Sequence, residues 1–66
     1  MNITVNGIPE PVVDGTTLAA LMSARALPAS GIAAAVNGDV VRVALWAETV
    51  LADQDVVEIV TAKQGG

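Results

Sequence analysis

The chain has 66 residues, 53% of them apolar, which is enough for one compact globular domain and too few for two. It contains neither Cys nor His, which excludes disulfides, thiolate chemistry, zinc sites of the usual ligand types and an imidazole general base. The net charge of −4 has the wrong sign for nucleic-acid binding, and no apolar stretch approaches the ~20 residues that span a bilayer.

The first 13 residues predict a β-hairpin. Residues 3–5 and 8–13 read as two strands, and Asn6-Gly7 between them readily supplies the positive φ angles of a tight turn. Pro9 and Pro11 cannot donate backbone hydrogen bonds to a neighbouring strand. We therefore expect the second strand to lie at an edge of its sheet.

A short helix is predicted next. Asp14-Gly15 ends the hairpin, and the hydroxyl of Thr16 or Thr17 can cap the helix by accepting a bond from a free backbone N–H. Pro28 disfavours helical geometry in the residue before it, so the helix should end near Ala26. Leu18, Leu21 and Met22 lie at helical spacing and form an apolar stripe that can pack on a sheet. Arg25 follows at the same spacing.

Residues 32–36 and 40–43 predict a second hairpin. The first of these segments contains three alanines, which favour helix. Asn37-Gly38 is nevertheless a strong turn signal, and β-branched residues lie on both sides of it. We therefore expect two more strands here.

The last third of the chain predicts a connector and a final strand. Residues 44–51 are expected to form a short helical turn or an irregular segment, with Trp46, Val50 and Leu51 turned inward. Asp53-Gln54-Asp55 makes the turn into a β-rich run at residues 56–61. A lone Trp in an acidic chain suits a place in the core better than a platform for stacking bases.

This order of elements predicts an α+β domain of the ubiquitin-like β-grasp type, a mixed sheet of four to five strands packed on one helix. By analogy with that fold, the final strand lies beside the first and parallel to it, at the centre of the sheet. We expect the domain to cover residues 1–62. Residues 63–66 then form a flexible C-terminal tail that ends in Gly65-Gly66 and carries the terminal carboxylate.

Several segments, taken in order, resemble the ThiS family of sulfur-carrier proteins of thiamine biosynthesis nearly end to end. At Gln54 the family commonly has Gly, so the turn there can differ in detail. The matching segments are Ile3-Thr4-Val5-Asn6-Gly7, Asp14-Gly15-Thr16-Thr17-Leu18, Ala35-Val36-Asn37-Gly38-Asp39-Val40-Val41-Arg42, Trp46-Ala47-Glu48-Thr49-Val50-Leu51, Asp55-Val56-Val57-Glu58-Ile59-Val60 and Gln64-Gly65-Gly66.

The resemblance implies a protein co-substrate without catalytic residues, bound cofactor or bound metal of its own. A ThiF-like adenylating enzyme would use ATP to convert the carboxylate of Gly66 to an acyl-adenylate. Sulfur from a persulfide protein would replace AMP to give a thiocarboxylate, and a ThiG-like thiazole synthase would receive that sulfur. Lys63, Gln64 and Gly65 would lie in the partner's channel.

Plainer interpretations of the same residues stay open. Gly65-Gly66 can be a frayed end, and Lys63 and Gln64 can be solvated residues without a role. Arg42 suits a surface cation better than a docking residue. Ser23 and Ser30 have no evident activating base, which argues against a hydroxyl nucleophile.

Two further features bear on metal binding and location. Asp53 and Asp55 alternate as calcium ligands can, but their loop lacks the further oxygen ligands and the closing Glu of an EF-hand. Met1-Asn2 lacks the basic start of a signal peptide, so we expect a cytoplasmic protein that binds neither nucleic acid nor a membrane.

Three other functions remain as alternatives to the thiamine carrier. Related carriers deliver sulfur to molybdopterin or to cysteine biosynthesis, a ubiquitin-like modifier would join Gly66 to lysine amines, and a plain interaction domain would need no tail chemistry. A carrier that docks on two enzymes in turn is expected to expose an apolar patch on its sheet. The sequence does not assign the residues of that patch.

Overall fold

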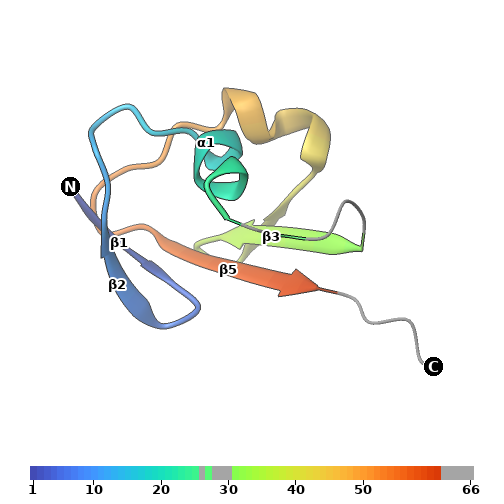
Figure 1. Ribbon diagram of the computed structural model, residues 1–66, viewed down its shortest axis with the longest axis horizontal. Helices are drawn as coiled ribbons and strands as arrows, with labels where there is room; N and C mark the ends of the chain where they lie inside the picture. The colour runs from blue at the N-terminus through green and yellow to red at the C-terminus, as the bar shows by residue number, and fades with distance from the viewer. Residues whose placement is uncertain (26, 28–30, 62–66) are drawn as a thin grey trace.

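The computed structural model describes residues 1–25, 27 and 31–61, and Figure 1 shows its elements. One α-helix and one 3₁₀ helix accompany the strands within these residues. In chain order the elements are β1 (Asn2–Val5), β2 (Ile8–Pro11), α1 (Leu18–Ser23), β3 (Ile32–Val36), β4 (Asp39–Val41), the 3₁₀ helix η1 (Val43–Glu48) and β5 (Val56–Thr61).

The strands form one five-stranded sheet in the order β2-β1-β5-β3-β4. β5 runs parallel to β1 and antiparallel to β3, and both hairpins are antiparallel. The final strand is therefore central and beside the first, and β2 with its two prolines lies at an edge. The predicted β-grasp architecture is confirmed.

Both predicted Asn-Gly turns have the backbone geometry of tight hairpins. Asn6 and Gly7 have φ angles of 51° and 81°, and Asn37 and Gly38 have 52° and 88°. Two successive residues with positive φ give the chain a twist that matches the flanking strands. The alanine-rich segment is a strand, as predicted, because this turn and pairing with β5 outweigh its helix propensity.

Helix α1 is shorter than predicted. Of the two candidate caps, Thr17 fills the role, and its Oγ1 accepts from the N–H of Ala20 at 3.1 Å. The helix ends at Ser23, and the prediction of an end near Ala26 is wrong in this respect. The N–H of Arg25 donates to the carbonyl of Met22 at 3.2 Å, an i to i−3 bond that tightens the chain out of the α-helix.

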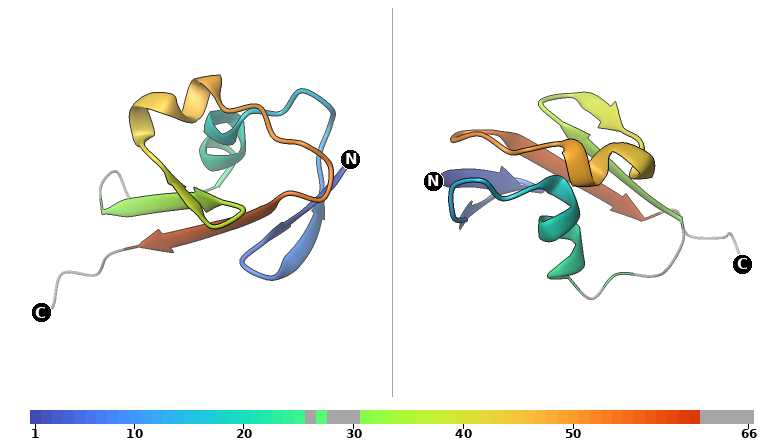
Figure 2. Two further views of the ribbon diagram at one scale, coloured as in Figure 1. Left: turned by 180° about the vertical axis from the view of Figure 1, so that it is seen from behind. Right: turned by 90° about the horizontal axis from the view of Figure 1, so that it is seen from above.

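The helices and the sheet form two layers around one apolar core. Figure 1 and the two views of Figure 2 show α1 and η1 over the same face of the sheet. No helix in the described part of the chain is long and apolar enough to cross a membrane. The buried side chains of the core are Ile3, Val5, Leu18, Leu21, Met22, Ala34, Leu51 and Val57.

Two strands end earlier than the sequence predicted. β2 ends at Pro11 and does not extend to Val13, whose side chain is exposed. β4 ends at Val41, where the prediction extended to Val43. Val43 opens η1 instead. Arg42 has extended backbone angles and is the N-cap of η1, where its carbonyl accepts from the N–H of Leu45 at 2.8 Å.

The segment after β4 is helical over η1, as one of the two expectations had it, but one of the three side chains predicted to turn inward is exposed. Val50 is 62% exposed, so its predicted inward orientation is wrong. Residues 49–51 are extended beside the start of α1, and the N–H of Leu51 donates to the carbonyl of Thr16 at 2.9 Å. Successive side chains of an extended segment alternate, so the burial of Leu51 directs Val50 outward.

Trp46 packs against the core from the side of η1. Its ring is half-buried, and its Nε1 donates to the carbonyl of Val41 at 2.8 Å. The indole thus contributes apolar area while its polar atom has a partner. This agrees with the predicted place of Trp46 in the core, although the side chain is not fully enclosed.

Candidate functional site

The predicted carrier tail lies beyond the last described residue. Lys63, Gln64, Gly65 and Gly66, and the predicted domain boundary after residue 62, lie outside the described residues. The last described residue of β5 is Thr61, which pairs with Ile32 at the start of β3. The structure therefore fixes the strand from which the tail continues.

That strand is apolar on both faces. Val57 is fully buried in the core, whereas Val56 and Val60 are 45% and 61% exposed. Side chains in a strand alternate between faces, so Val56 and Val60 lie on the face away from the helix. Ile59 shares the inner face with Val57 and packs against the core.

The neighbouring strands extend this exposed surface, which we call the outer sheet face. The strand register places Ala33 beside Val60, and Ala35 between Val40 and Glu58. Val40 is 75% exposed, and Thr4 lies beside Val56 on the β1 side. The outer sheet face comprises Thr4, Ala33, Ala35, Val40, Val56, Glu58 and Val60.

The outer sheet face is the apolar patch that the sequence predicted without naming its residues. Within the described part of the chain, the helices lie on the opposite side of the sheet (Figure 2). Three exposed valines and two alanines surround one carboxylate, that of Glu58. Such an apolar area beside the end of β5 is suited to contact another protein.

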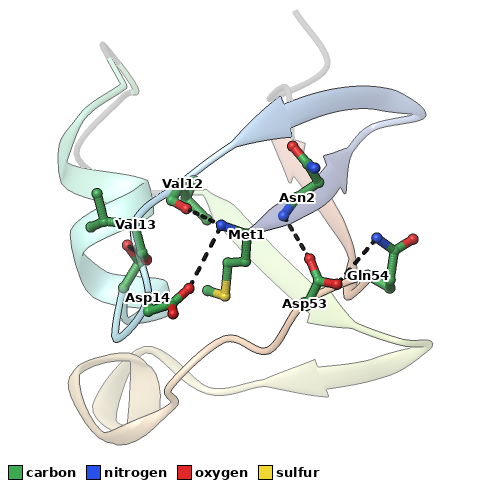
Figure 3. Close-up of polar contacts among 8 residues, drawn as sticks. Met1, Asn2, Val12, Val13, Asp14, Asp53 and Gln54 are labelled. Atoms are coloured by element: carbon green, nitrogen blue, oxygen red, sulfur yellow. Dashed lines mark hydrogen bonds and ion pairs between the residues drawn. The ribbon is translucent and has the colours of Figure 1, made fainter.

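Asp53 and Asp55, weighed as a calcium site, accept hydrogen bonds within the fold. Asp53 accepts from the backbone N–H of Asn2 at 2.7 Å and from Nε2 of Gln54 at 3.4 Å (Figure 3). Asp55 accepts from Nδ2 of Asn37 at 2.9 Å and from the N–H of Ala52 at 2.7 Å. The described residues contain no group of three or more acidic, His or Cys side chains placed to hold a metal ion.

These contacts shift the ionisation of Asp53. The hydrogen bond from Asn2 is the largest cause that lowers its pKa below the ordinary value of 3.8, and Gln54 adds to the effect. The amino group of Met1 also lowers this pKa by charge attraction. That group donates to the carbonyl of Val12 at 2.8 Å and lies 3.6 Å from Oδ1 of Asp14. Figure 3 draws both contacts as dashed lines.

The remaining candidates have structural or surface positions. Ser23 is the exposed last residue of α1, and Ser30 lies outside the described residues. Arg42 is exposed at the start of η1, where it suits the surface role expected for it. Arg25 pairs with Glu10 of β2 and so joins the end of α1 to the sheet edge.

Two asparagines make long-range hydrogen bonds that the sequence did not predict. Asn6 and Asn37 were identified as turn residues, yet both side chains bond to the backbone of β5. Each Asn-Gly pair directly follows an apolar strand, but a turn motif alone does not show which distant strand its amide reaches. The residues of the outer sheet face were missed for a similar reason, because Val56, Val57, Ile59 and Val60 look alike in sequence.

Comparison with known proteins identifies the family. The family model described as "ThiS family" matches residues 3–66. The chain belongs to the ThiS family. This match includes the predicted Gly65-Gly66 end, and the membership supports a sulfur-carrier role in thiamine synthesis.

Two solved structures from Geobacter metallireducens have the same fold as this ThiS-family chain. A crystal structure of the thiamine biosynthesis protein ThiS is 32% identical with a TM-score of 0.86, and the match covers 100% of both chains. A solution structure of a thiamine biosynthesis protein is 30% identical with a TM-score of 0.80, covering 100% of this chain and 88% of that one. No curated protein matches this chain.

Proposed function

We propose that the protein carries sulfur for the thiazole ring of thiamine as a thiocarboxylate on Gly66. The observation that carries this proposal is the ThiS-family match, which runs through residue 66 and so includes the diglycine end. The similarity to a ThiS structure over the whole of both chains supports the same role. The protein would act as a co-substrate, and its partners would supply the catalysis.

The chemistry explains why an activating step is needed. A terminal carboxyl group has a pKa of about 3.5, so at neutral pH it is an anion and a poor electrophile. Attack of this carboxylate on the α-phosphorus of ATP, with pyrophosphate leaving, gives an acyl-adenylate. A ThiF-like adenylating enzyme would catalyse this step, and ATP is its substrate.

Sulfur then replaces the nucleotide. The terminal sulfur of a partner's persulfide displaces AMP from the acyl carbon, and a thiol reduces the resulting S–S bond to release the thiocarboxylate. Its ionised sulfur is a soft nucleophile, as a thiolate is, and could attack the substrate of a ThiG-like thiazole synthase. Glycine at residues 65 and 66 lacks Cβ, so the backbone can enter a narrow channel.

The outer sheet face would provide the docking surface for these partners. Its exposed valines lie on β4 and β5, and the tail continues from the end of β5. Residues 62–66, if fully extended, would reach at most about 17 Å from Thr61. A partner bound to the sheet could therefore receive Gly66 in an active site next to that contact.

The absence of Cys gives a direct test. The protein is incubated with ATP, a persulfide donor and the adenylating enzyme, treated with a thiol-alkylating reagent, and analysed by intact mass. We expect one added label, which peptide mapping places on Gly66. A variant that lacks Gly65-Gly66 is the control and should take up no label.

Other outcomes would identify a different function. No label on the full chain after this incubation would contradict the carrier chemistry. Covalent adducts with lysines of other proteins would favour a modifier. A strain that needs this protein for thiazole synthesis should regain growth without thiamine when it receives the full chain, and the truncated variant should not restore it.

A further inference from the structure

Asn6 makes two hydrogen bonds to one distant residue of β5. Its Oδ1 accepts from the N–H of Ile59 at 2.7 Å, and its Nδ2 donates to the carbonyl of Ile59 at 3.2 Å. The two residues are 53 positions apart in sequence. A primary amide carries the same donor and acceptor as a peptide group, so this side chain can replace a backbone partner.

Asn6 lies where the backbone of β1 turns away from β5. β1 ends at Val5, and its backbone bonds to β5 end with the N–H of Asn6 donating to the carbonyl of Val57 at 2.9 Å. Ile59 is the next residue of β5 that faces β1, because residues of a strand alternate in the side toward which they bond. The Asn6 side chain thus continues the β1 side of the ladder past the point where the backbone turns away.

Asn37 makes a comparable clamp at the other end of the same strand. Its backbone N–H donates to the carbonyl of Val56 at 2.7 Å, and its Oδ1 accepts from the N–H of Val56 at 2.9 Å. Both asparagines have positive φ in Asn-Gly turns. Asn37 therefore holds the start of β5, whereas Asn6 bonds two residues before the last described residue of the strand, Thr61.

We propose that Asn6 is a positioning residue for the carrier tail. By bonding both backbone groups of Ile59, it holds the end of β5 in the plane of the sheet and fixes the direction in which the chain continues at Thr61. β3 supports the same residues from the other side through the pairs Ala34–Ile59 and Ile32–Thr61. This inference rests on the proposed function, in which Gly66 reacts on a partner enzyme.

A matched pair of variants tests the proposal. Asn6→Gly and Asn37→Gly each keep a residue that accepts positive φ, and each removes the side-chain bonds to β5. In hydrogen exchange measured by NMR, Asn6→Gly should raise the exchange rate of the Ile59 amide about tenfold, and Asn37→Gly that of Val56. This readout does not depend on any partner.

Adenylation kinetics then separate positioning from general stability. With carrier concentration varied, Asn6→Gly should raise KM about fivefold and leave kcat within twofold, because a looser end of β5 must be ordered on binding. Asn37→Gly should leave both parameters within twofold, although it loses similar bonds. Equal KM values for the two variants would overturn the inference. Adenylation of the wild-type protein in the same assay would still support the carrier function.

Two further outcomes are decisive as well. If wild type is not adenylated, the proposed function fails and the inference with it. If Asn6→Gly does not fold, Asn6→Asp replaces it, since aspartate keeps positive φ and the acceptor for Ile59 but loses the donor. A KM unchanged from wild type in Asn6→Asp would then overturn the role of Asn6, and a rise of about twofold to fivefold would support it.

Discussion

The backbone N–H of Gln54 donates to the carbonyl oxygen of Asn2 at 2.6 Å, which ties the turn before β5 to the first residue of β1. Gln54 makes this bond with a φ of 72°. Left-handed backbone is costly for a residue with a Cβ and readily accepted by glycine. The family that the sequence resembles commonly has Gly at this position, and glycine adopts such a φ without the cost that a Cβ adds.

Replacing Gln54 with glycine should raise the free energy of unfolding by about 1 kcal/mol. Urea denaturation followed by the fluorescence of Trp46, the single aromatic residue, measures this change. Gly7→Ala is the control in the opposite direction, because it adds a Cβ at a residue with φ +81° where a Cβ meets nothing within 4 Å. It should lower the free energy of unfolding by about 1 kcal/mol through backbone strain alone. A less stable Gln54→Gly would contradict this account.

The cap of α1 offers a second test of local structure. Thr17→Ala removes the acceptor for the N–H of Ala20 and should lower the free energy of unfolding by about 1 kcal/mol. Thr17→Ser keeps the hydroxyl and should retain most of that stability. The same urea titration compares the three proteins, and equal midpoints for alanine and wild type would show that the cap does not stabilise the helix.

Most of the fold could be predicted because its turns are specified locally. Each Asn-Gly pair lies between strand-forming residues, and Pro9 and Pro11 identify an edge strand. The central place of β5 came from analogy with the β-grasp fold. Element ends were less predictable. α1 ends at Ser23, shortly before the Arg25 that pairs with Glu10 of β2, and the orientation of Val50 follows from its pairing with Thr17.

Part of the candidate site could also be predicted from the sequence, and part could not. Gly66 follows from the resemblance and from the diglycine end, and it stays a prediction. The outer sheet face could not be assigned, because β5 is apolar on both sides and only the folded chain shows that Val57 lies in the core while Val56 and Val60 are exposed. The contact of Asn6 with Ile59 spans 53 positions and requires the folded chain.

The ionisation of Asp53 predicts how stability depends on pH. Its pKa is lowered chiefly by the hydrogen bond from Asn2, so the folded state favours the carboxylate. This contribution is present above the ordinary pKa of 3.8 and is lost as pH falls through the lower folded value. Urea midpoints from about pH 6 to about pH 2.5 should therefore fall less steeply for Asp53→Asn. If the urea midpoint of Asp53→Asn falls with pH as steeply as that of wild type, Asp53 does not contribute to the loss of stability in acid.

Val60 provides a test of the outer sheet face that leaves the core intact. It is 61% exposed on β5, close to the predicted tail, so Val60→Thr should alter stability by less than about 1 kcal/mol. In a partner interface the added hydroxyl would be buried without a hydrogen bond, at a cost of about 1–3 kcal/mol. We expect KM for the carrier in adenylation to rise about tenfold.

The matched control for this test is Val13→Thr, which makes the same change at a valine that is 77% exposed and lies after β2, outside the outer sheet face. Its KM should equal that of wild type. If both variants behave as wild type, the adenylating enzyme does not contact Val60. If both raise KM, the effect arises from lost exposed apolar area in general. A rise confined to Val60→Thr identifies the side of the sheet that the enzyme binds, because Val56 and Val40 lie on the same face as Val60.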